Sequence, residues 1–507
     1  MHSPPTSNRN DGQESDFLIP PISLTREIIL VFVIFLTNFM VQVGNIQGIL
    51  PDYAIAASFG ADPTDIAWFP ASYSLTSGTF MLAAGRLGDI YGHKKLYVVG
   101  WLWFALWSLL AGLSVYSRSA IFFDICRAMQ GIGPAILVPA SLAILGSVYR
   151  DGHRKNLAFA LYAAGAPVGF TVGGVFAALL AQLAEWSWSY YSTAIVCAGL
   201  AGLASFAIPP ICDKETTIPS SEGKNQFDYW GAFTGISGLI LFNFAWNRAP
   251  AVGWQKAQAI APLILGIILI GLFFSIEKKV SQPLLPINKL SKDAIFVLLV
   301  VGVGWSSFGI FIYYSVNFIT QLRQCSLLST AAQYVPVPFS GLAASLLTSF
   351  LLGRGVPTSY LLALSMFFFC GMNVLIAIMP VEQSYWRNMF WANVVAPFGM
   401  DISFPAATIL ISGMVEAGEQ GIAASLVATV VYYSQSVGLG FAGTAEAYIG
   451  KYGGSTLEGY RAALYVGIGL SGVGILVGMG YVFYDSMGGK RIEEKRTSDT
   501  ELAEESV

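Results

Sequence analysis

Long apolar runs dominate this chain of 507 residues and limit the folds open to it. Such runs recur between residues 28 and 484, with short polar segments between them. A helix of about 20 apolar residues crosses the ~30 Å hydrocarbon core of a bilayer, where only helices and closed barrels satisfy their own backbone hydrogen bonds. Only 11% of the residues are charged, against ~25% in soluble domains. The sequence therefore predicts an all-α membrane protein.

The runs predict fourteen transmembrane helices. They cover residues 28–50, 66–85, 96–116, 120–145, 157–182, 189–209, 229–247, 259–276, 293–320, 328–352, 358–379, 386–413, 421–449 and 461–484. Lysine and arginine together number 27, and they concentrate in alternate loops and in the two tails. Because cytoplasmic loops carry an excess of both residues, we expect both termini in the cytoplasm.

The chain also repeats itself. The run at 120–145 contains GIGPAILVPA and the run at 386–413 contains PFGMDISFPA, in which four residue types recur at the same spacing. These residues are Gly133, Ile136, Pro139 and Ala140 in the first copy and Gly399, Ile402, Pro405 and Ala406 in the second. The first six spans are thus repeated as the last six, with two spans inserted between them. Two repeated halves with a site between them are an architecture of secondary transporters.

This organisation divides the chain into six segments. We expect a disordered cytoplasmic tail (1–26), a six-helix bundle (27–210), a cytoplasmic loop (211–228), two inserted helices with a basic loop (229–292), a second six-helix bundle (293–484) and a cytoplasmic tail (485–507).

Residues that carry enzyme chemistry are sparse. The histidines, His2, His93 and His153, lie in polar segments, and the five cysteines lack the spacing of a disulfide framework or a metal site. No cluster of a nucleophile and a base is evident. We therefore expect no enzyme activity, no metal and no cofactor.

The span at 120–145 carries charge inside its apolar run. Arg127 lies one helical turn from Asp124, and Gln130 follows one turn later. A charge at the membrane centre costs about 2.5–3.5 kcal/mol on insertion scales, so it usually faces a partner or a watery cavity. Two interpretations remain open. Arg127 and Asp124 take part in proton coupling, with Gln130 orienting a water or substrate, or the two charges form a local pair.

Asp401 lies near the middle of the span at 386–413, with no basic residue near it in that span. Burial disfavours a charged carboxylate, so this group is a candidate for proton coupling. The alternatives are that Asp401 caps a helix segment broken by Pro405 or pairs statically with Arg127. The repeat aligns Arg127 with the uncharged Asn393. One half would therefore supply the positive charge, and the other half would supply the carboxylate of Asp401.

Two spans carry polar stripes. Asn38, Gln42 and Asn45 follow one another at helical spacing in the first span, and Tyr313 and Asn317 do so in the ninth. Such residues contact a substrate or only form hydrogen bonds between helices. We favour substrate contact.

Two motifs resemble those of a known family. The loop after the second span reads GRLGDIYGHKK from Gly85, and the fourth span contains RAMQGIG from Arg127. Both resemble signature motifs of the major facilitator superfamily. Fourteen spans resemble its drug:proton antiporter branch, and WSWSYY from Trp186 resembles the fungal aminotriazole-resistance and low-affinity ammonium transporter group. The resemblance implies a major facilitator fold, with two six-helix bundles plus two inserted linker helices.

The resemblance also implies roles for the loop. Gly85, Asp89, Gly92 and Lys94 would form the conformational switch, which braces one state of the transporter and releases on switching. Glycines allow the tight turn and close approach that this needs. The alternative is a plain cytoplasmic turn, and Ile90 stands where the family usually has a basic residue.

The fifth span departs from the family pattern. Exporters of the family carry a G-P-x-x-G-G element, which matches the stretch from Gly169 to Gly174 here. Gly169, Gly173 and Gly174 would keep helix packing close, but Phe170 replaces the proline. Since this element is associated with antiport, the direction of transport stays open.

The resemblance implies a secondary transporter that works by alternating access. Proton-coupled efflux of a small organic compound or toxin is the leading interpretation. Uptake or facilitated passage of a small solute such as ammonium or borate is the second, and a non-transporting nutrient sensor is the third. The expected partners are a small-molecule substrate, protons and the lipid bilayer, with no nucleic acid. We expect a monomer, in the plasma membrane rather than the vacuolar membrane.

Overall fold

The computed structural model describes residues 23–62, 65–150, 152–209, 227–285, 287, 290–414 and 420–504. Within these residues all the long elements are α-helices. Most of the expected N-terminal tail and of the expected loop at 211–228 lies outside the described residues.

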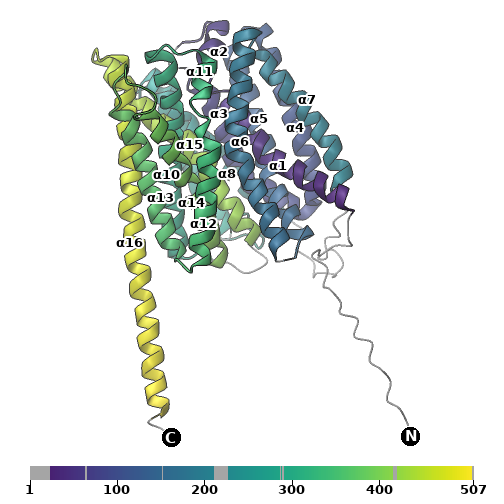
Figure 1. The fold of residues 1–507 in the computed structure, drawn as a ribbon, viewed down its shortest axis with the longest axis vertical. Helices are drawn as coiled ribbons and strands as arrows, with labels where there is room; N and C mark the ends of the chain where they lie inside the picture. The colour runs from purple at the N-terminus through teal and green to yellow at the C-terminus, as the bar shows by residue number, and fades with distance from the viewer. Residues whose placement is uncertain are drawn as a thin grey trace.

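Six long helices form the N-terminal half. They are α1 (Leu24–Ile46), α3 (Trp68–Tyr91), α4 (His93–Leu113), α5 (Ala120–Val148), α6 (His153–Leu183) and α7 (Ser187–Ala207). The first predicted span ran to residue 50, but α1 ends at Ile46 and the chain turns into a short helix, α2 (Asp52–Phe59). Figure 1 shows α2 at one end of the bundle, here named the α2 end.

Local signals set several helix ends. Ser23 and Ser119 precede α1 and α5, and their hydroxyls accept backbone N–H groups of the first turn. Gly92 has a φ of 92°, a conformation that favours glycine, and it joins the end of α3 directly to the start of α4.

The C-terminal half has the same order of helices. It contains α10 (Lys292–Asn317), α12 (Pro336–Gly353), α13 (Thr358–Ala377), α14 (Met389–Gly413), α15 (Gln420–Lys451) and α16 (Thr456–Glu504). The span predicted at 328–352 is divided into α11 (Leu327–Ala332) and α12. Pro336 at the start of α12 explains the break, because proline has no N–H to continue a preceding helix.

The two halves share one packing order. α1 packs on α6 as α10 packs on α15, and α4 contacts α5 and α7 as α13 contacts α14 and α16. The halves meet along two seams: the first seam joins α3 to α15, and the second joins α6 to α12. The sequence repeat aligns α3 with α12 and α6 with α15, so the two seams are equivalent contacts.

The repeated glycines lie in equivalent places. A Cβ built on Gly133 would lie 2.8 Å from Phe104 of α4, and one built on Gly399 would lie 2.8 Å from Phe369 of α13. In both halves, therefore, the glycine lets one aromatic ring approach the helix backbone.

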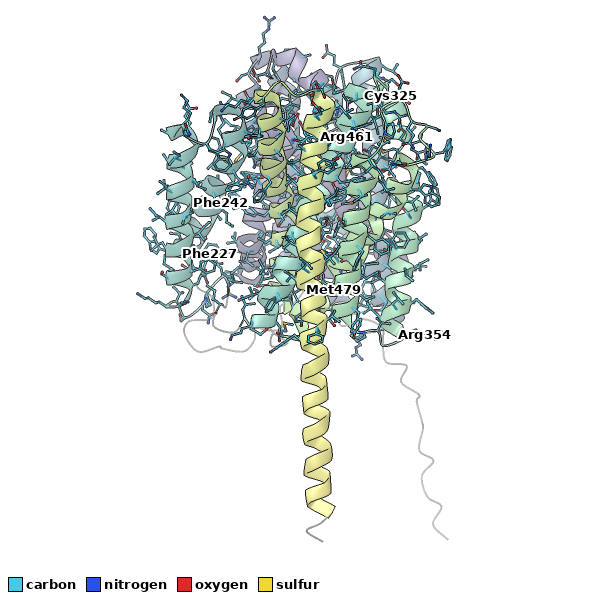
Figure 2. The ribbon with its side chains drawn as sticks, turned by 90° about the vertical axis from the view of Figure 1, so that its left-hand side faces the viewer. Phe227, Phe242, Cys325, Arg354, Arg461 and Met479 are labelled. Carbon is cyan, nitrogen blue, oxygen red and sulfur yellow. The ribbon has the colours of Figure 1, made fainter. Side chains whose placement is uncertain are left out.

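The inserted helices, α8 (Tyr229–Val252) and α9 (Ala257–Glu277), pack on each other, and α8 also contacts α15 and α3. Tyr433 of α15 donates its hydroxyl to the carbonyl of Leu239 at 2.9 Å, and Asn247 donates to the carbonyl of Ser436 at 3.1 Å. Figure 2 shows Phe242 of α8 toward one edge of the bundle. The inserted pair therefore covers the first seam from one side.

Eleven helices of the described chain are long and apolar enough to cross a membrane. Three long helices fall short of that hydropathy: α3, α8 and α15. These three pack against one another. Their contact faces carry buried polar residues, among them Asn243 and Ser436, whose side chains form a hydrogen bond with each other. Polar residues on surfaces that neighbouring helices cover explain the lower mean hydropathy.

The last helix is longer than its predicted span. α16 continues to Glu504, whereas the span was expected to end at residue 484. Figure 1 shows the final part of α16 projecting beyond the bundle, at the end opposite α2.

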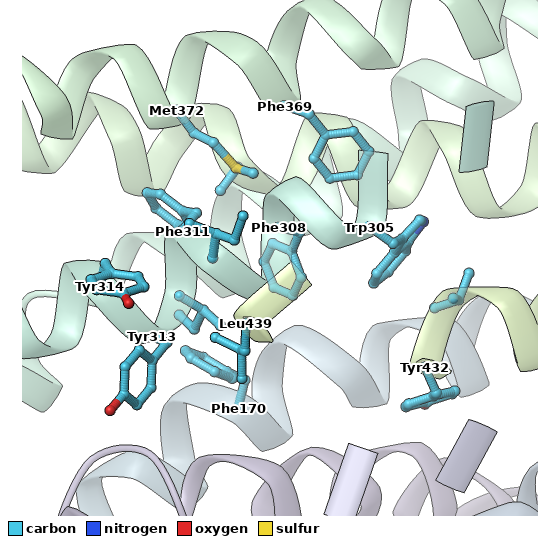
Figure 3. Close-up of a cluster of buried hydrophobic side chains, with 14 of the residues drawn as sticks. Phe170, Trp305, Phe308, Phe311, Tyr313, Tyr314, Phe369, Met372, Tyr432 and Leu439 are labelled. Carbon is cyan, nitrogen blue, oxygen red and sulfur yellow. The ribbon is translucent and has the colours of Figure 1, made fainter. Parts of the chain in front are cut away.

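The largest buried cluster centres on α10 (Figure 3). It includes Trp305, Phe308, Phe311, Tyr313 and Tyr314 of α10 together with Phe369, Met372, Tyr432, Leu439 and Phe170. Phe170 comes from α6 of the other half, and its ring meets Tyr334 edge-on with centroids 5.7 Å apart. Phe170 and Tyr334 therefore form an aromatic contact across the second seam.

Candidate functional site

Arg127 is fully buried within the N-terminal half. Its Nε donates to the carbonyl of Phe69 at 3.1 Å, and its Nη1 donates to Oε1 of Gln130. The guanidinium carbon lies 4.6 Å from the ring centroid of Tyr73 and 5.7 Å from that of Tyr190. Cation–π contacts and a backbone carbonyl thus replace a carboxylate as the partners of this charge.

One N–H group of Arg127 remains unsatisfied. Its Nη2 is buried without a hydrogen-bond partner, and a Cβ built on Gly48 would lie 2.6 Å from that atom. Gln130 extends the network by donating to Oγ of Ser108 at 2.8 Å. The guanidinium therefore fills the turn between α1 and α2 and retains one free donor.

Asp124 and Arg127 do not form the local pair that the sequence allowed. The guanidinium turns toward Phe69 and Gln130, and Oδ1 of Asp124 is buried without a hydrogen-bond partner. The charged groups that act on Asp124 are Asp65, Arg127 and Arg248, and Asp65 and Arg248 form an ion pair with each other.

Asp401 faces the second seam. A Cβ built on Gly341 of α12 would lie 3.1 Å both from Oδ2 of Asp401 and from the ring of Pro167 of α6. Oδ2 is buried without a hydrogen-bond partner, while the backbone carbonyl of Asp401 accepts from Thr348 at 3.3 Å. The carboxyl group therefore lies beside Gly341 of its own half, at the place where α12 meets Pro167 of the other half.

The structure does not bring Asp401 and Arg127 together. No ion pair joins them, and the contacts of Arg127 lie within the N-terminal half. α14 also runs unbroken from Met389 through Pro405 to Gly413, so Asp401 lies inside a helix and caps no broken segment.

The polar stripe of α1 divides into two parts. Nδ2 of Asn38 donates to the carbonyl of Tyr162 in α6 at 3.1 Å, which is a helix–helix contact. Gln42 is half-buried and Asn45 is buried, and neither side chain forms a hydrogen bond to another described residue. These two amides are free for a ligand.

Tyr313 and Asn317 lie at the α2 end, where a buried carboxylate escaped the sequence analysis. Asp52 and Asn317 are neighbours and are each 1% exposed. Asp52 follows directly after the first apolar run and starts α2, a helix that the sequence did not predict. Apart from Pro51, which precedes Asp52, nothing in the sequence indicated that this carboxylate is buried. Burial raises the pKa of Asp52 well above its ordinary value.

Tyrosine hydroxyls surround this region. Tyr53 of the first half and Tyr460 of the second bring their hydroxyl oxygens to 3.3 Å, and Tyr314 donates to Oε2 of Glu446 at 2.6 Å. Figure 3 shows Tyr313 and Tyr314 side by side on α10. Burial raises the pKa of Tyr53.

The signature loop joins several elements at the opposite end. Oδ1 of Asp89 lies 3.2 Å from Nε2 of His93, one turn on. Lys94 donates to the carbonyl of Ile208, which follows α7. Gly92 provides the turn described above.

Two further loop contacts reach other parts of the chain. A Cβ built on Gly85 would lie 2.9 Å from Oγ of Ser425 in α15, so this glycine brings the loop against the first seam. Nη2 of Arg86 donates to Oε1 of Gln282 at 3.1 Å, which ties the loop to the segment that follows the inserted helices.

The glycines of α6 touch the backbone of α1. A Cβ on Gly169 would lie within 2.2 Å of the carbonyl of Phe39, and one on Gly173 would lie 2.8 Å from Cα of Val43. Gly174 has more space, with its nearest contact at 3.4 Å. The first two allow no larger side chain without a shift of the helices.

Family comparison agrees with this architecture. The family profile described as Major Facilitator Superfamily matches residues 28–381, which is well over half of the chain. The chain belongs to the Major Facilitator Superfamily. It is therefore a multi-pass integral membrane transporter and not an enzyme.

Relatives within the superfamily include three fungal transport proteins. The chain is 47% identical to the low affinity ammonium transporter of Saccharomyces cerevisiae, with 94% of this chain and 92% of that protein covered. It is 40% identical to an efflux pump of Aspergillus terreus (92% and 90% covered) and 36% identical to the aminotriazole resistance protein of S. cerevisiae (94% and 88% covered). The group expected from the sequence is confirmed.

The superfamily fold is also found among solved structures. The crystal structure of a POT family transporter in complex with 5-aminolevulinic acid matches with a TM-score of 0.64 at 12% identity, and 92% of this chain and 98% of that chain are covered. At this identity the likeness concerns the fold alone. The expected all-helical major facilitator fold is confirmed.

Proposed function

We propose that this protein is a proton-coupled secondary transporter that exports a small organic compound by alternating access. The observation that carries the proposal is the position of Asp401. Its Oδ2 lies without a hydrogen-bond partner against the second seam, which is one of the two surfaces that must separate when the halves rock. A carboxyl group there is buried in one state and hydrated in the other.

Protonation of Asp401 would follow from that change of environment. A buried carboxylate without a partner is unfavourable, so the closed seam favours the neutral acid. An open, hydrated seam favours the ionised form. A proton is thus taken up or released as the seam closes or opens, which couples rocking of the halves to a proton gradient.

The remaining polar groups are proposed to bind the substrate. Gln42 and Asn45 offer amides without protein partners, and Nη2 of Arg127 offers a free donor in the same half. Gln130 holds the guanidinium in place. Tyr313 and Asn317 line the opposite half near the α2 end.

Topology and location belong to the same proposal. All fourteen long helices would cross the membrane, with both termini in the cytoplasm and the α2 end outside. The protein would work as a monomer in the plasma membrane. Support comes from the lysines and arginines of alternate loops and from the equivalence of the two halves, each with six long helices.

Uptake or facilitated passage of a small solute is a second candidate. Phe170 stands where the family's exporters carry proline, and its ring packs across the second seam on Tyr334. One relative, 47% identical, is named a low affinity ammonium transporter. These observations are compatible with inward passage of a small solute along the second seam.

Flux into reconstituted vesicles tests these proposals. The purified full chain would be placed in vesicles with an imposed pH gradient, and uptake of ammonium, borate and aromatic or heterocyclic drugs would be measured. We expect drug flux whose direction reverses when the pH gradient is reversed. Asp401→Asn should make this flux independent of the gradient. Glu382→Gln, at an exposed carboxylate, is the matched control and should keep coupled flux.

Each alternative has its own result. Flux that does not depend on the pH gradient would exclude antiport and favour facilitated passage. Binding of a ligand without any flux of that ligand would favour a sensor. Coupled flux that survives Asp401→Asn would exclude Asp401 as the coupling residue.

A further inference from the structure

Two buried carboxyl groups meet where the inserted helices begin and end. Asp228 caps the start of α8, and Glu277 is the last residue of α9. They are 8% and 2% exposed. Figure 2 shows Phe227, the residue before Asp228, nearer than Phe242 to the end of the bundle from which α16 projects. The two carboxyl groups therefore lie at the same end as the signature loop.

Each carboxyl group has one satisfied oxygen and one free oxygen. Oδ1 of Asp228 accepts the N–H of Gly231 at 2.8 Å, and Oε2 of Glu277 accepts the N–H of Leu285 at 3.0 Å. Oδ2 of Asp228 and Oε1 of Glu277 are buried without a hydrogen-bond partner. A Cβ built on Gly231 would lie within 2.8 Å of both free oxygens. Because both lie so close to one point, they are separated by less than twice that distance.

A single proton satisfies both free oxygens. Among the described residues, neither Asp228 nor Glu277 forms an ion pair with a lysine, arginine or histidine. Two ionised carboxylates would therefore repel each other in a buried place without compensation, which is unfavourable. A proton on one free oxygen removes one of the charges. It also creates an O–H donor that the other free oxygen accepts.

The segment that follows α9 connects this pair to the signature loop. Its Leu285 is held by Glu277, and Gln282, three residues earlier, accepts Nη2 of Arg86 at 3.1 Å. Arg86 belongs to the signature loop at the end of α3. A displacement of the Glu277 carboxylate would therefore move the segment and break its contact with Arg86.

We propose that Asp228 and Glu277 form a proton-binding site at the cytoplasmic end, whose shared proton holds the segment 278–285 against the signature loop through Gln282 and Arg86. Loss of the proton separates the two carboxylates by repulsion and releases the segment. A rise in cytoplasmic pH would therefore loosen the signature loop. The cytoplasmic assignment rests on the proposed orientation of the transporter, and the site adds a second group of residues on which pH acts.

A cavity gives protons a route to the pair. It has a volume of about 240 Å³ and is lined by residues from the start of α8 and from the segment after α9, among them Asp228, Trp230, Ser281 and Gln282. Because Asp228 lines this cavity, a proton need not pass through the helix bundle to reach it.

Other charged and titratable groups near the pair have partners of their own or are exposed. From α3, Arg86 bonds to Gln282, and Tyr91 interacts with Tyr229 of α8. From the described part of α15, Tyr433 bonds to Leu239, about three turns further along α8.

Three further groups lie at this end of the bundle. Lys278 and Lys279 follow Glu277 and are exposed. His93 lies 3.2 Å from Asp89 within the signature loop. A pH response of His93 would not depend on either carboxyl group of the pair, so variants of Asp228 and Glu277 distinguish the two sources.

Fluorescence quenching tests whether the segment is in place. A bimane label on Ser281→Cys should be quenched by Trp230, because both residues line the same cavity. The full-length protein, with its five native cysteines replaced, would be measured in lipid nanodiscs between pH 5 and pH 8, without substrate. Trp230→Phe identifies the part of the quenching that this ring causes.

We expect the quenched-to-unquenched ratio to fall as pH rises, by at most about tenfold per pH unit for one proton. Glu382→Gln, at an exposed carboxylate, is the control and should respond as the wild type does. In Asp228→Asn and in Glu277→Gln the amide supplies the donor at every pH. The label should then stay quenched, with a change in the ratio below about twofold. Asparagine also caps helices, so Asp228→Asn keeps the start of α8.

Three results would overturn the proposal. The first is a wild-type signal that does not depend on pH. The second is either a full pH response or an unquenched label at every pH in both amide variants. The third is a signal that follows added calcium at constant pH, which would indicate a bound cation in place of the proton. Because no substrate or gradient is used, none of these results depends on the vesicle test of transport.

Discussion

Arg127 and Asn393 occupy equivalent positions in the repeat, and each donates to a backbone carbonyl near the start of the second long helix of its half. Nε of Arg127 bonds to the carbonyl of Phe69 in the first turn of α3, and Nδ2 of Asn393 bonds to the carbonyl of Gln333, just before α12, at 2.8 Å. Both side chains are fully buried. Each half therefore uses a polar residue of its fourth helix to hold the start of its second helix, and only the first half adds a charge there.

The free donor of Arg127 depends on a glycine. We expect Gly48→Ala to displace the guanidinium, because the new Cβ would lie 2.6 Å from Nη2. Gradient-driven flux in vesicles should fall about tenfold or more, since small misplacements of a functional group carry large rate penalties. Gly146→Ala, where the Cβ meets nothing within 4 Å, should leave flux unchanged. Equal flux in both variants would show that this position of Arg127 is not required.

The signature loop offers a test by rescue. A methyl group at Gly85 would lie 2.9 Å from Oγ of Ser425, so Gly85→Ala should disturb the first seam and reduce flux about fivefold, the scale of a coupling of about 1 kcal/mol. Ser425→Ala removes the opposing oxygen, and the double variant should recover most of the loss. Additive losses in a double-mutant cycle would rule out this contact as the cause.

Close packing of α1 on α6 predicts a stability difference between two glycines. Gly169→Ala inserts a methyl group against the backbone of Phe39 and should cost about 1–3 kcal/mol, as overpacking usually does. Gly199→Ala places its methyl group in open space and should be neutral or slightly stabilising, because alanine favours helices. Thermal unfolding in detergent, followed by tryptophan fluorescence, compares the two melting temperatures. The same melting temperature for both would contradict a tight α1–α6 contact.

Stability should depend on pH through Asp52. Its pKa is higher in the folded protein than in the unfolded chain, so the folded state binds the extra proton. The stabilising effect is complete at low pH and is lost as pH rises through the folded-state pKa, by up to about 1.36 kcal/mol per pH unit. We therefore expect the melting temperature of the wild type to fall relative to that of Asp52→Asn between pH 5 and pH 8. A constant difference would contradict this assignment.

Most of the helical framework could be predicted because bilayer thickness fixes the length of an apolar run. The predicted spans at 120–145 and 358–379 became α5 (Ala120–Val148) and α13 (Thr358–Ala377). The ends of spans were less predictable. α2 is a short helix of eight residues outside the predicted runs, and Pro336 divides a run that hydropathy alone treats as continuous.

The site was only partly predictable, because sequence spacing locates a side chain along a helix but not its partner. Arg127 and Asp401 were found as charges inside apolar runs, yet the repeat suggested a pair where the fold separates them. Asp52 was missed because an acidic residue just after an apolar run is usually an exposed helix end. Its neighbour, Asn317, is 265 positions away in the sequence, and only the packing of the two halves brings them together.

The inserted helices make the two seams unequal toward the lipid. α8 covers the first seam through Leu239 and Asn247, whereas α6 and α12 have no such cover among the described residues. A lipophilic compound dissolved in the bilayer would therefore have one side of the protein from which to approach the interface between the halves. The two inserted helices therefore remove the equivalence of the two sides of the protein, since they cover the first seam and leave the second seam uncovered in the described part of the chain.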